Sequence, residues 1–223
     1  MTPPTRRGFV VACTATLAGC GLLPEESEPI EASATAPAVL PESSGYSLVV
    51  EEAPTIEATV TVDFSGDVEL TSRQDVIATV FQRVYEAASG TRFGLLTAPA
   101  VRVVDQPEVV RDPLTAVDDA RVVGLATAAD VDGVSEWSEN GSATLLGSEP
   151  TRLAASATLD GSERDLARVR VRAGEDSVTA IATDPDAAAP PFEAVTRDVA
   201  AAADIEKKAL LKSVAADSFF RPC

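Results

Sequence analysis

The sequence predicts an α+β domain with a mainly antiparallel sheet and a few packed helices, placed after an export signal and a tether. Three observations lead to this prediction. Several segments alternate apolar and polar residues with a period of two, which is typical of strands with one solvated face. A few other segments carry helix caps or a helical stripe of apolar residues. The strands follow one another across short turns without an alternating βαβ rhythm, which favours antiparallel pairing.

Residues 1–19 have the layout of an export signal. Arg6 and Arg7 precede an apolar stretch from Gly8 to Gly19, and Cys20 follows it. The stretch has roughly a dozen residues, whereas a helix needs about twenty to cross a bilayer, so we expect it to be removed after export. The paired arginines are typical of the twin-arginine export consensus.

A second motif, the lipobox Leu17, Ala18 and Gly19, leads directly to Cys20. In lipoproteins with this motif the cysteine sulfur takes a diacylglyceryl group and becomes the first residue after cleavage. Two acyl chains are about what stable anchoring requires. The sequence therefore predicts a protein that is exported and anchored by lipid on Cys20 to the outer face of the cytoplasmic membrane. The alternative, a buried helix that ends in cysteine, is disfavoured by the spacing of both motifs.

Residues 20–44 are predicted to form an acidic, proline-rich tether. From Leu22 to Ser44 the segment has four prolines, several acids and no sustained apolar period. Such a composition buries too little apolar surface to order itself, and its prolines and charges favour extension. A single α+β domain is placed at residues 45–223.

The first strands of the domain are predicted from alternation. Thr55 to Phe64 alternate strictly, and a turn at Ser65-Gly66-Asp67 leads into a second alternating segment, so we predict a hairpin. Asp75 to Ala88 suits a helix or a strand, and its Val, Ile, Thr, Phe and Tyr residues favour the strand. A further strand is predicted at Phe93 to Val104, interrupted at Pro99.

The second half of the chain alternates in the same way. Strands are predicted at 142–146, 152–160, 166–173 and 177–183, with a turn at Gly174-Glu175-Asp176 before the last of them. Helices are predicted at 113–129, 191–203 and 204–216. The first of these has Asp112 as its N-cap and Pro113 in its first turn.

The composition is strongly acidic, with 35 Asp and Glu against 18 Lys and Arg and a formal net charge of −17. The acids are scattered along the chain, which indicates a solvated surface rather than a docking face for a cationic partner. Repulsion between them is largely screened near 1 M salt, where the Debye length is about 3 Å, so we predict a halophilic protein. Nucleic-acid binding is excluded because a phosphate backbone requires a positive surface.

Three stretches carry a resemblance to a known family. They are Arg6-Arg7 with the lipobox, the apolar segment from Phe93 to Val101, and the segment from Ala173 to Pro185. In the order of these parts the chain resembles a haloarchaeal family of secreted, twin-arginine-exported lipoproteins that is catalogued only as a domain of unknown function. The resemblance implies a place outside the cell and assigns no activity, so no catalytic residue is transferred from it.

The chain has no histidine, and its three cysteines form no cluster. Histidine is the usual general base at neutral pH and the commonest zinc ligand, so Ser-His and Cys-His nucleophiles and zinc sites are excluded. Neither G-x-S-x-G nor a phosphate-binding glycine loop occurs. We therefore expect no catalytic residue, no cofactor and no metal, and a chain that is not an enzyme.

Carboxylates are the remaining candidates for catalysis. The pairs Asp118-Asp119 and Asp184-x-Asp186 could act as acid and base or hold a cation, and Asp130-x-Asp132-Gly133 begins like a calcium loop. In so acidic a chain, pairs of this kind arise by chance and favour a solvated surface. They nevertheless leave open a carboxylate- or metal-dependent hydrolase acting on envelope material.

Two further features point to binding or modification. Arg168, Arg170 and Arg172 alternate along one strand and form a candidate face for an anionic ligand or an envelope protein, unless they pair with acids on neighbouring strands. Asn140 lies in the sequence Asn140-Gly141-Ser142, which matches the glycosylation sequon. The leading hypothesis is a non-catalytic envelope lipoprotein that binds a ligand or partner, and the remaining alternative is a structural surface protein.

Overall fold

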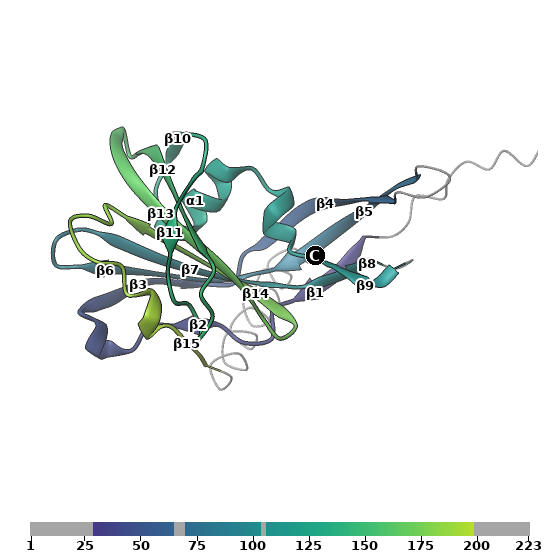
Figure 1. Cartoon of the computed structure of the whole chain (residues 1–223), viewed down its shortest axis with the longest axis horizontal. Helices are drawn as coiled ribbons and strands as arrows, with labels where there is room; N and C mark the ends of the chain where they lie inside the picture. Colours follow the sequence, from purple (N-terminus) through teal and green to yellow (C-terminus); the bar gives the residue numbers. More distant parts are fainter. Residues whose placement is uncertain (1–28, 65–69, 104–105, 199–223) are drawn as a thin grey trace, which may run out of the picture.

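The computed structural model describes residues 29–64, 70–103 and 106–198, and these residues form a mainly β protein (Figure 1). In this part of the chain α1 (Asp119–Thr127) is the one α-helix, and the other helical residues form short 3-10 turns. The predicted α+β class with several packed helices is therefore wrong. Within the described residues, the helix predicted at 113–129 is present only in part, and the one predicted from residue 191 is replaced by a 3-10 turn and a two-residue strand.

An antiparallel sheet of eight strands forms the body of the protein. Its order is β10-β12-β13-β14-β7-β6-β3, and β11 pairs with β12 beside β10. The predicted strands at 152–160, 166–173 and 177–183 are confirmed, whereas the one at 142–146 lies earlier, as β11. The bounds are β3 (Tyr46–Glu52), β6 (Phe81–Ala87), β7 (Arg92–Pro99), β10 (Val131–Val134), β11 (Ser138–Ser142), β12 (Thr151–Leu159), β13 (Ser162–Ala173) and β14 (Asp176–Thr183).

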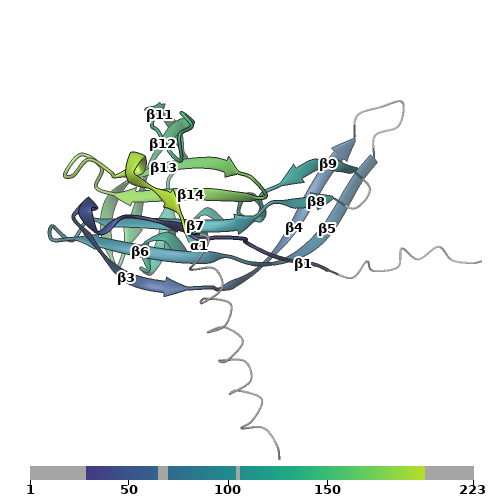
Figure 2. The same ribbon diagram turned by 90° about the horizontal axis from the view of Figure 1, so that it is seen from below.

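A second sheet of three strands extends from the body, and we call it the arm (Figures 1 and 2). It consists of β1 (Ile30–Ser33), β4 (Thr55–Phe64) and β5 (Leu70–Thr79), in the order β1-β5-β4. The pairing of β4 with β5 is antiparallel, which confirms the predicted hairpin, and β1 joins β5 in parallel. The strand favoured for residues 75–88 is confirmed as β5 and β6.

The same two chain segments build the arm and one edge of the body. Only Val80 separates β5 from β6, and Ala53 and Pro54 separate β3 from β4. The Val80 amide donates a hydrogen bond to the Pro54 carbonyl oxygen at 3.0 Å, so the two segments stay paired across the break. Two short ribbons complete the fold: β2 (Ala38–Val39) with β15 (Thr196–Arg197), and β8 (Val101–Val103) with β9 (Gln106–Arg111).

Both faces of the main sheet are covered. On one face α1 buries Val122, Val123 and Ala126 against the sheet. This close packing depends on Gly94 in β7, because a Cβ at this position would lie 1.8 Å from the carbonyl oxygen of Ala126. The other face is covered by β2, the turn η3 (Phe192–Ala194) and the segment around Leu145.

Part of the predicted tether belongs to the folded domain. Residues 30–44 form β1, β2 and the turn η1 (Glu42–Ser44), and Ala34, Ala36 and Ala38 are 1–3% exposed. The domain therefore begins before Gly45, the start that the composition predicts. The composition is misleading here because small alanines pack into sites that other strands provide, without any apolar period of their own. Residues 20–28 lie outside the described residues.

The predicted helices are only partly present. Residues 113–129 contain the turn η2 (Pro113–Ala116) and then α1, and the Asp112 side chain caps η2 as predicted, accepting a hydrogen bond from the Leu114 amide at 2.9 Å. Residues 191–203 do not begin a long helix. The chain forms η3 and then β15, because Thr196 and Arg197 pair with β2. The helix predicted at 204–216 lies outside the described residues.

Candidate functional site

The arginine row of β13 lies on the sheet face that α1 covers. The Arg168 guanidinium donates to the Asp119 carboxylate at 2.7 Å, and its central carbon lies 4.0 Å from the centre of the Trp137 ring. The Arg168 side chain is only 14% exposed. A cation stacked on an aromatic ring and paired with a carboxylate is a well-satisfied group, so Arg168 fixes the start of α1 to the sheet.

Arg170 has a similar internal partner. Its Nε donates to the Thr179 hydroxyl at 2.9 Å and lies 3.4 Å from the Asp112 carboxylate that caps η2. Burial lowers the pKa of the Arg170 guanidinium, and the neighbouring Asp112 carboxylate acts in the opposite direction. Arg172 is exposed and donates to the Gly174 carbonyl oxygen at 3.2 Å.

The acids that face this row come from the starts of η2 and α1 and not from adjacent strands. Asp112 and Asp119 are separated from β13 by more than forty residues of chain, as the Arg168–Asp119 separation of 49 residues shows. No strand pattern could indicate this pairing, because it depends on where the segment containing η2 and α1 crosses the sheet. That the row binds an external anion stays a prediction, and its exposed member is Arg172.

The carboxylate pairs have roles within the fold. Asp118 caps α1, accepting hydrogen bonds from the amides of Ala120 at 2.8 Å and Arg121 at 3.3 Å. Asp184 pairs with Arg164 at 2.9 Å. Within residues 29–64, 70–103 and 106–198, no three His, Cys, Asp or Glu side chains are grouped so that they could share a metal ion.

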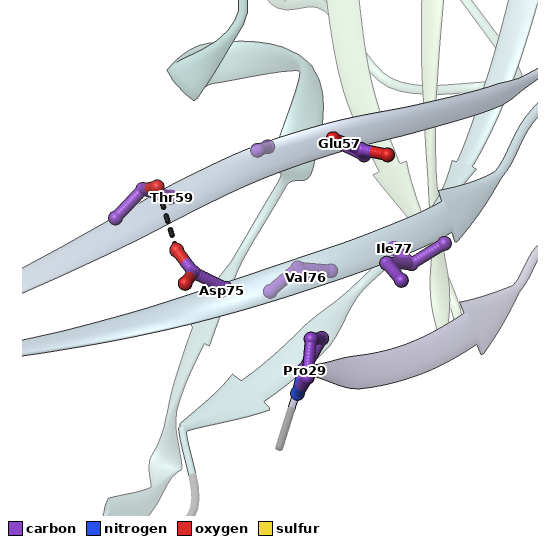
Figure 3. Close-up of a pocket in the computed structure, with 7 residues that line it drawn as sticks. Pro29, Glu57, Thr59, Asp75, Val76 and Ile77 are labelled. Atoms are coloured by element: carbon purple, nitrogen blue, oxygen red, sulfur yellow. Dashed lines mark hydrogen bonds between the residues drawn. The ribbon is translucent and has the colours of Figure 1, made fainter. Parts of the chain in front are cut away.

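A hollow of about 410 Å³ lies on the outer surface of the arm (Figure 3). Its polar side chains come from the exposed positions of β4 and β5, and the Thr59 hydroxyl donates to the Asp75 carboxylate at 2.7 Å. Glu57 and Ile77 are direct partners across the two strands. The lining residues are Pro29, Glu57, Ala58, Thr59, Asp75, Val76 and Ile77.

We call this depression the arm hollow. It places two carboxylates, Glu57 and Asp75, beside the aliphatic side chain of Ile77. Carboxylates accept hydrogen bonds from cationic groups, and an aliphatic neighbour packs against the carbon chain of such a group. The hollow can therefore hold an arginine or lysine side chain. Sequence reasoning missed it because its polar residues match an ordinary solvated strand face, and the one signal was Ile77 on that face.

A second hollow, of about 510 Å³, lies between α1 and the β6 edge of the body. The Gln82 side chain donates to the Leu125 carbonyl oxygen at 2.6 Å and so ties the helix to the sheet there. Its lining includes side chains of both charges, namely Glu52, Arg121 and Asp130. This mixture favours no single ligand, so the arm hollow is the better candidate site.

The predicted N-terminal sites, Arg6, Arg7, the lipobox at 17–19 and Cys20, lie outside the described residues. Asn140 is described and lies exposed in β11. In the part of the chain that the structure covers, no helix combines the length and apolar character needed to span a bilayer.

Comparison with known proteins gives one match. A family model described as "Domain of unknown function (DUF6517)" covers residues 33–215, which is most of the chain. Neither a curated protein nor a solved structure matches. The start of the match at residue 33 agrees with a domain that includes the segment before Gly45.

Proposed function

We propose a function for this chain, which belongs to the DUF6517 family: a non-catalytic binding protein of the cell envelope, anchored by lipid on Cys20. The observation that carries the proposal is the position of the arm hollow. It is lined by Pro29, the first described residue, which follows Cys20 by nine residues. The candidate binding surface therefore begins where the anchored segment ends.

The length of chain after Cys20 limits the distance between membrane and domain. Nine residues reach at most about 30 Å when fully extended, because each residue adds no more than ~3.6 Å. This is much shorter than the tether expected from sequence, since residues 30–44 are part of the fold. An anchored domain would thus hold its arm near the lipid surface, within reach of other envelope proteins.

The partner chemistry follows from the arm hollow. Glu57 and Asp75 favour a basic side chain, and Ile77 favours an apolar one beside it. An extended protein segment supplies both when a basic residue lies next to apolar residues. We propose a partner protein with such a segment.

The anchor is tested in the native cell by fractionation and mass spectrometry. The protein is expected with membranes, with Cys20 as its first residue and a diacylglyceryl group on the sulfur. Replacing Cys20 by Ser should release the protein from membranes, and replacing Arg6 and Arg7 by Lys should block export. Unprocessed wild-type protein with a free thiol at position 20 would contradict the anchor.

The binding site is tested by NMR titration of the full chain with a synthetic extended peptide that has arginine between valines. Chemical-shift changes are expected at Thr59, Asp75 and Ile77. The double variant Glu57→Gln, Asp75→Asn should bind about fivefold more weakly, because exposed ion pairs contribute roughly 0.2–1 kcal/mol each.

The matched control is the double variant Glu163→Gln, Glu193→Gln, which removes two exposed carboxylates, one on β13 and one on η3, outside the arm. It should leave the peptide affinity unchanged. Equal weakening by the control would show that the peptide responds to net charge alone, and the arm hollow would then be rejected as the site.

Adaptation to high salt is part of the same proposal. With a formal charge of −17, the folded chain should gain stability as salt screens repulsion between its acids. The melting temperature measured in KCl should rise between about 0.1 M and about 2 M. A melting temperature that does not change with KCl would argue against the halophilic assignment.

A further inference from the structure

Asn140 occupies an exposed edge of the main sheet. All five residues of β11, Ser138–Ser142, are exposed, and they include the complete sequon Asn140-Gly141-Ser142. Asn140 is also the single asparagine in the sequence. An enzyme that reads the sequon would therefore find its target amide and the hydroxyl two residues later at the surface.

The backbone leaves space around the sequon. The pairing of β11 with β12 is irregular between Glu139 and Ser142, and Gly141 has a φ of 79°. No atom lies within 4 Å of where a Cβ on Gly141 would be. Asn140 itself is exposed, so a bulky group attached to its side chain is open to solvent.

β11 also has an unpaired outer edge in the described part of the chain. It pairs with β12 alone, and β12 is paired with β13 on its other side. An edge strand with free amide and carbonyl groups can pair with a strand of another molecule, and natural proteins usually block such edges. β11, Ser-Glu-Asn-Gly-Ser, has one charged residue, Glu139, and the register shift at Asn140 and Gly141, but it has neither lysine nor proline to block the edge.

We infer that Asn140 carries an N-linked glycan, which covers the outer edge of β11 and prevents edge-to-edge association. The side-chain amide nitrogen of Asn140 forms a bond to the anomeric carbon of the sugar. The bond between that carbon and the oxygen of a lipid-phosphate sugar donor breaks, the lipid phosphate leaves, and the amide loses one proton to solvent. The inference rests on the export that the proposed function includes.

The modification is tested on the anchored protein purified from membranes of the native cell. Mass spectrometry of the peptide that contains Asn140 should show a hexose-based mass increase on that residue. The variants Asn140→Gln and Ser142→Ala should lack the increase, whereas Ser142→Thr keeps the sequon and should retain it. Membrane-bound wild-type protein with unmodified Asn140 overturns the inference and leaves the proposed anchor intact.

Export and glycosylation fail in distinguishable ways. If the protein is found in the cytosol with unmodified Asn140 and an intact N-terminus, the proposed function fails first and the inference fails with it. Glycosylated protein that has been released by Cys20→Ser supports the inference, because export then continues without the anchor.

The protective role is tested by light scattering in molar salt. Glycosylated wild type is expected to be monomeric, and Asn140→Gln is expected to self-associate as its concentration rises. Adding Ser138→Lys to the Asn140→Gln variant should restore the monomer by placing a lysine on the same edge. A monomeric Asn140→Gln variant at every concentration would overturn the protective role.

Discussion

The body and the arm share two chain segments, yet they bury their residues differently. In the body, Phe81 to Tyr85 of β6 are all buried, and Phe93 to Pro99 of β7 are buried as well. In the arm, residues 55–61 of β4 alternate between exposed and buried. These central strands of the body are covered on both faces, whereas the arm packs only its inner face, through Ile56, Val60 and Val76, against the rest of the core.

This difference explains which region can hold a site. A strand covered on both faces has no side chains left to contact a ligand, and the half-buried arginines of β13 are paired within the fold. A strand with one free face presents every second residue to solvent. The arm hollow uses such residues, Glu57, Thr59 and Asp75.

The largest expected effect is in the body, where Gly94→Ala should destabilise the fold by about 4 kcal/mol or more. The new Cβ would lie 1.8 Å from the Ala126 carbonyl oxygen, which is a backbone atom of α1 and cannot rotate away. Denaturant unfolding measures the change. Gly133→Ala, with no atom within 4 Å of its Cβ, should change stability by less than about 0.5 kcal/mol.

The next effect lies where the body meets the arm. The Asp176 side chain is fully buried, accepts hydrogen bonds from the Thr35 amide at 3.0 Å and the Thr35 hydroxyl at 2.5 Å, and pairs with Arg197. Asp176→Ala leaves these donors unpaired and should cost about 3 kcal/mol in chemical denaturation. Glu175→Ala removes only an exposed ion pair with Arg102 and should cost less than about 0.5 kcal/mol. An equal loss of stability in the two variants would show that the buried contacts of Asp176 do not hold the segment after β1 to the body.

The smallest change in stability is expected in the arm, where its two faces can be compared. Ile56→Ala removes a fully buried side chain and should cost about 2 kcal/mol, whereas Ile77→Ala on the outer face should cost less than about 1 kcal/mol. Thermal unfolding of both variants measures the difference. Similar losses would mean that the outer face is also covered in solution, and the arm hollow would then be occupied by the protein itself.

The strands that alternate most clearly could be predicted from sequence. Thr55–Phe64 and Thr151–Leu159 are examples, because a face exposed to water requires polar residues at every second position. The segment 30–44 could not be predicted. Its backbone is held in place by hydrogen bonds to β5, β7 and Asp176, and its alanines are therefore buried. One of these bonds joins the Ala38 amide to the Thr97 hydroxyl at 3.0 Å.

The site was harder to predict than the fold. The Arg168–Asp119 and Arg170–Asp112 pairs join a strand to the starts of α1 and η2, and only the three-dimensional path of the chain brings them together. The sequence pattern therefore indicated a binding role for arginines that form ion pairs within the fold. Glu57 and Asp75 looked like two acids among many, and only the pairing of β4 with β5 places them around one depression.

The carboxylate of Asp176 has a mechanical consequence for a protein held by its N-terminus. Tension from a lipid on Cys20 would enter the domain at β1, a strand of only four residues. To unravel the chain further, that force must first break the contacts of Thr35 with Asp176. Because Asp176 is the first residue of β14, the load passes directly to a central strand of the sheet, and Arg197 of β15 holds the same carboxylate in place. The contacts of Asp176 with Thr35 and Arg197 would thus resist unfolding of the core when the anchored end is pulled.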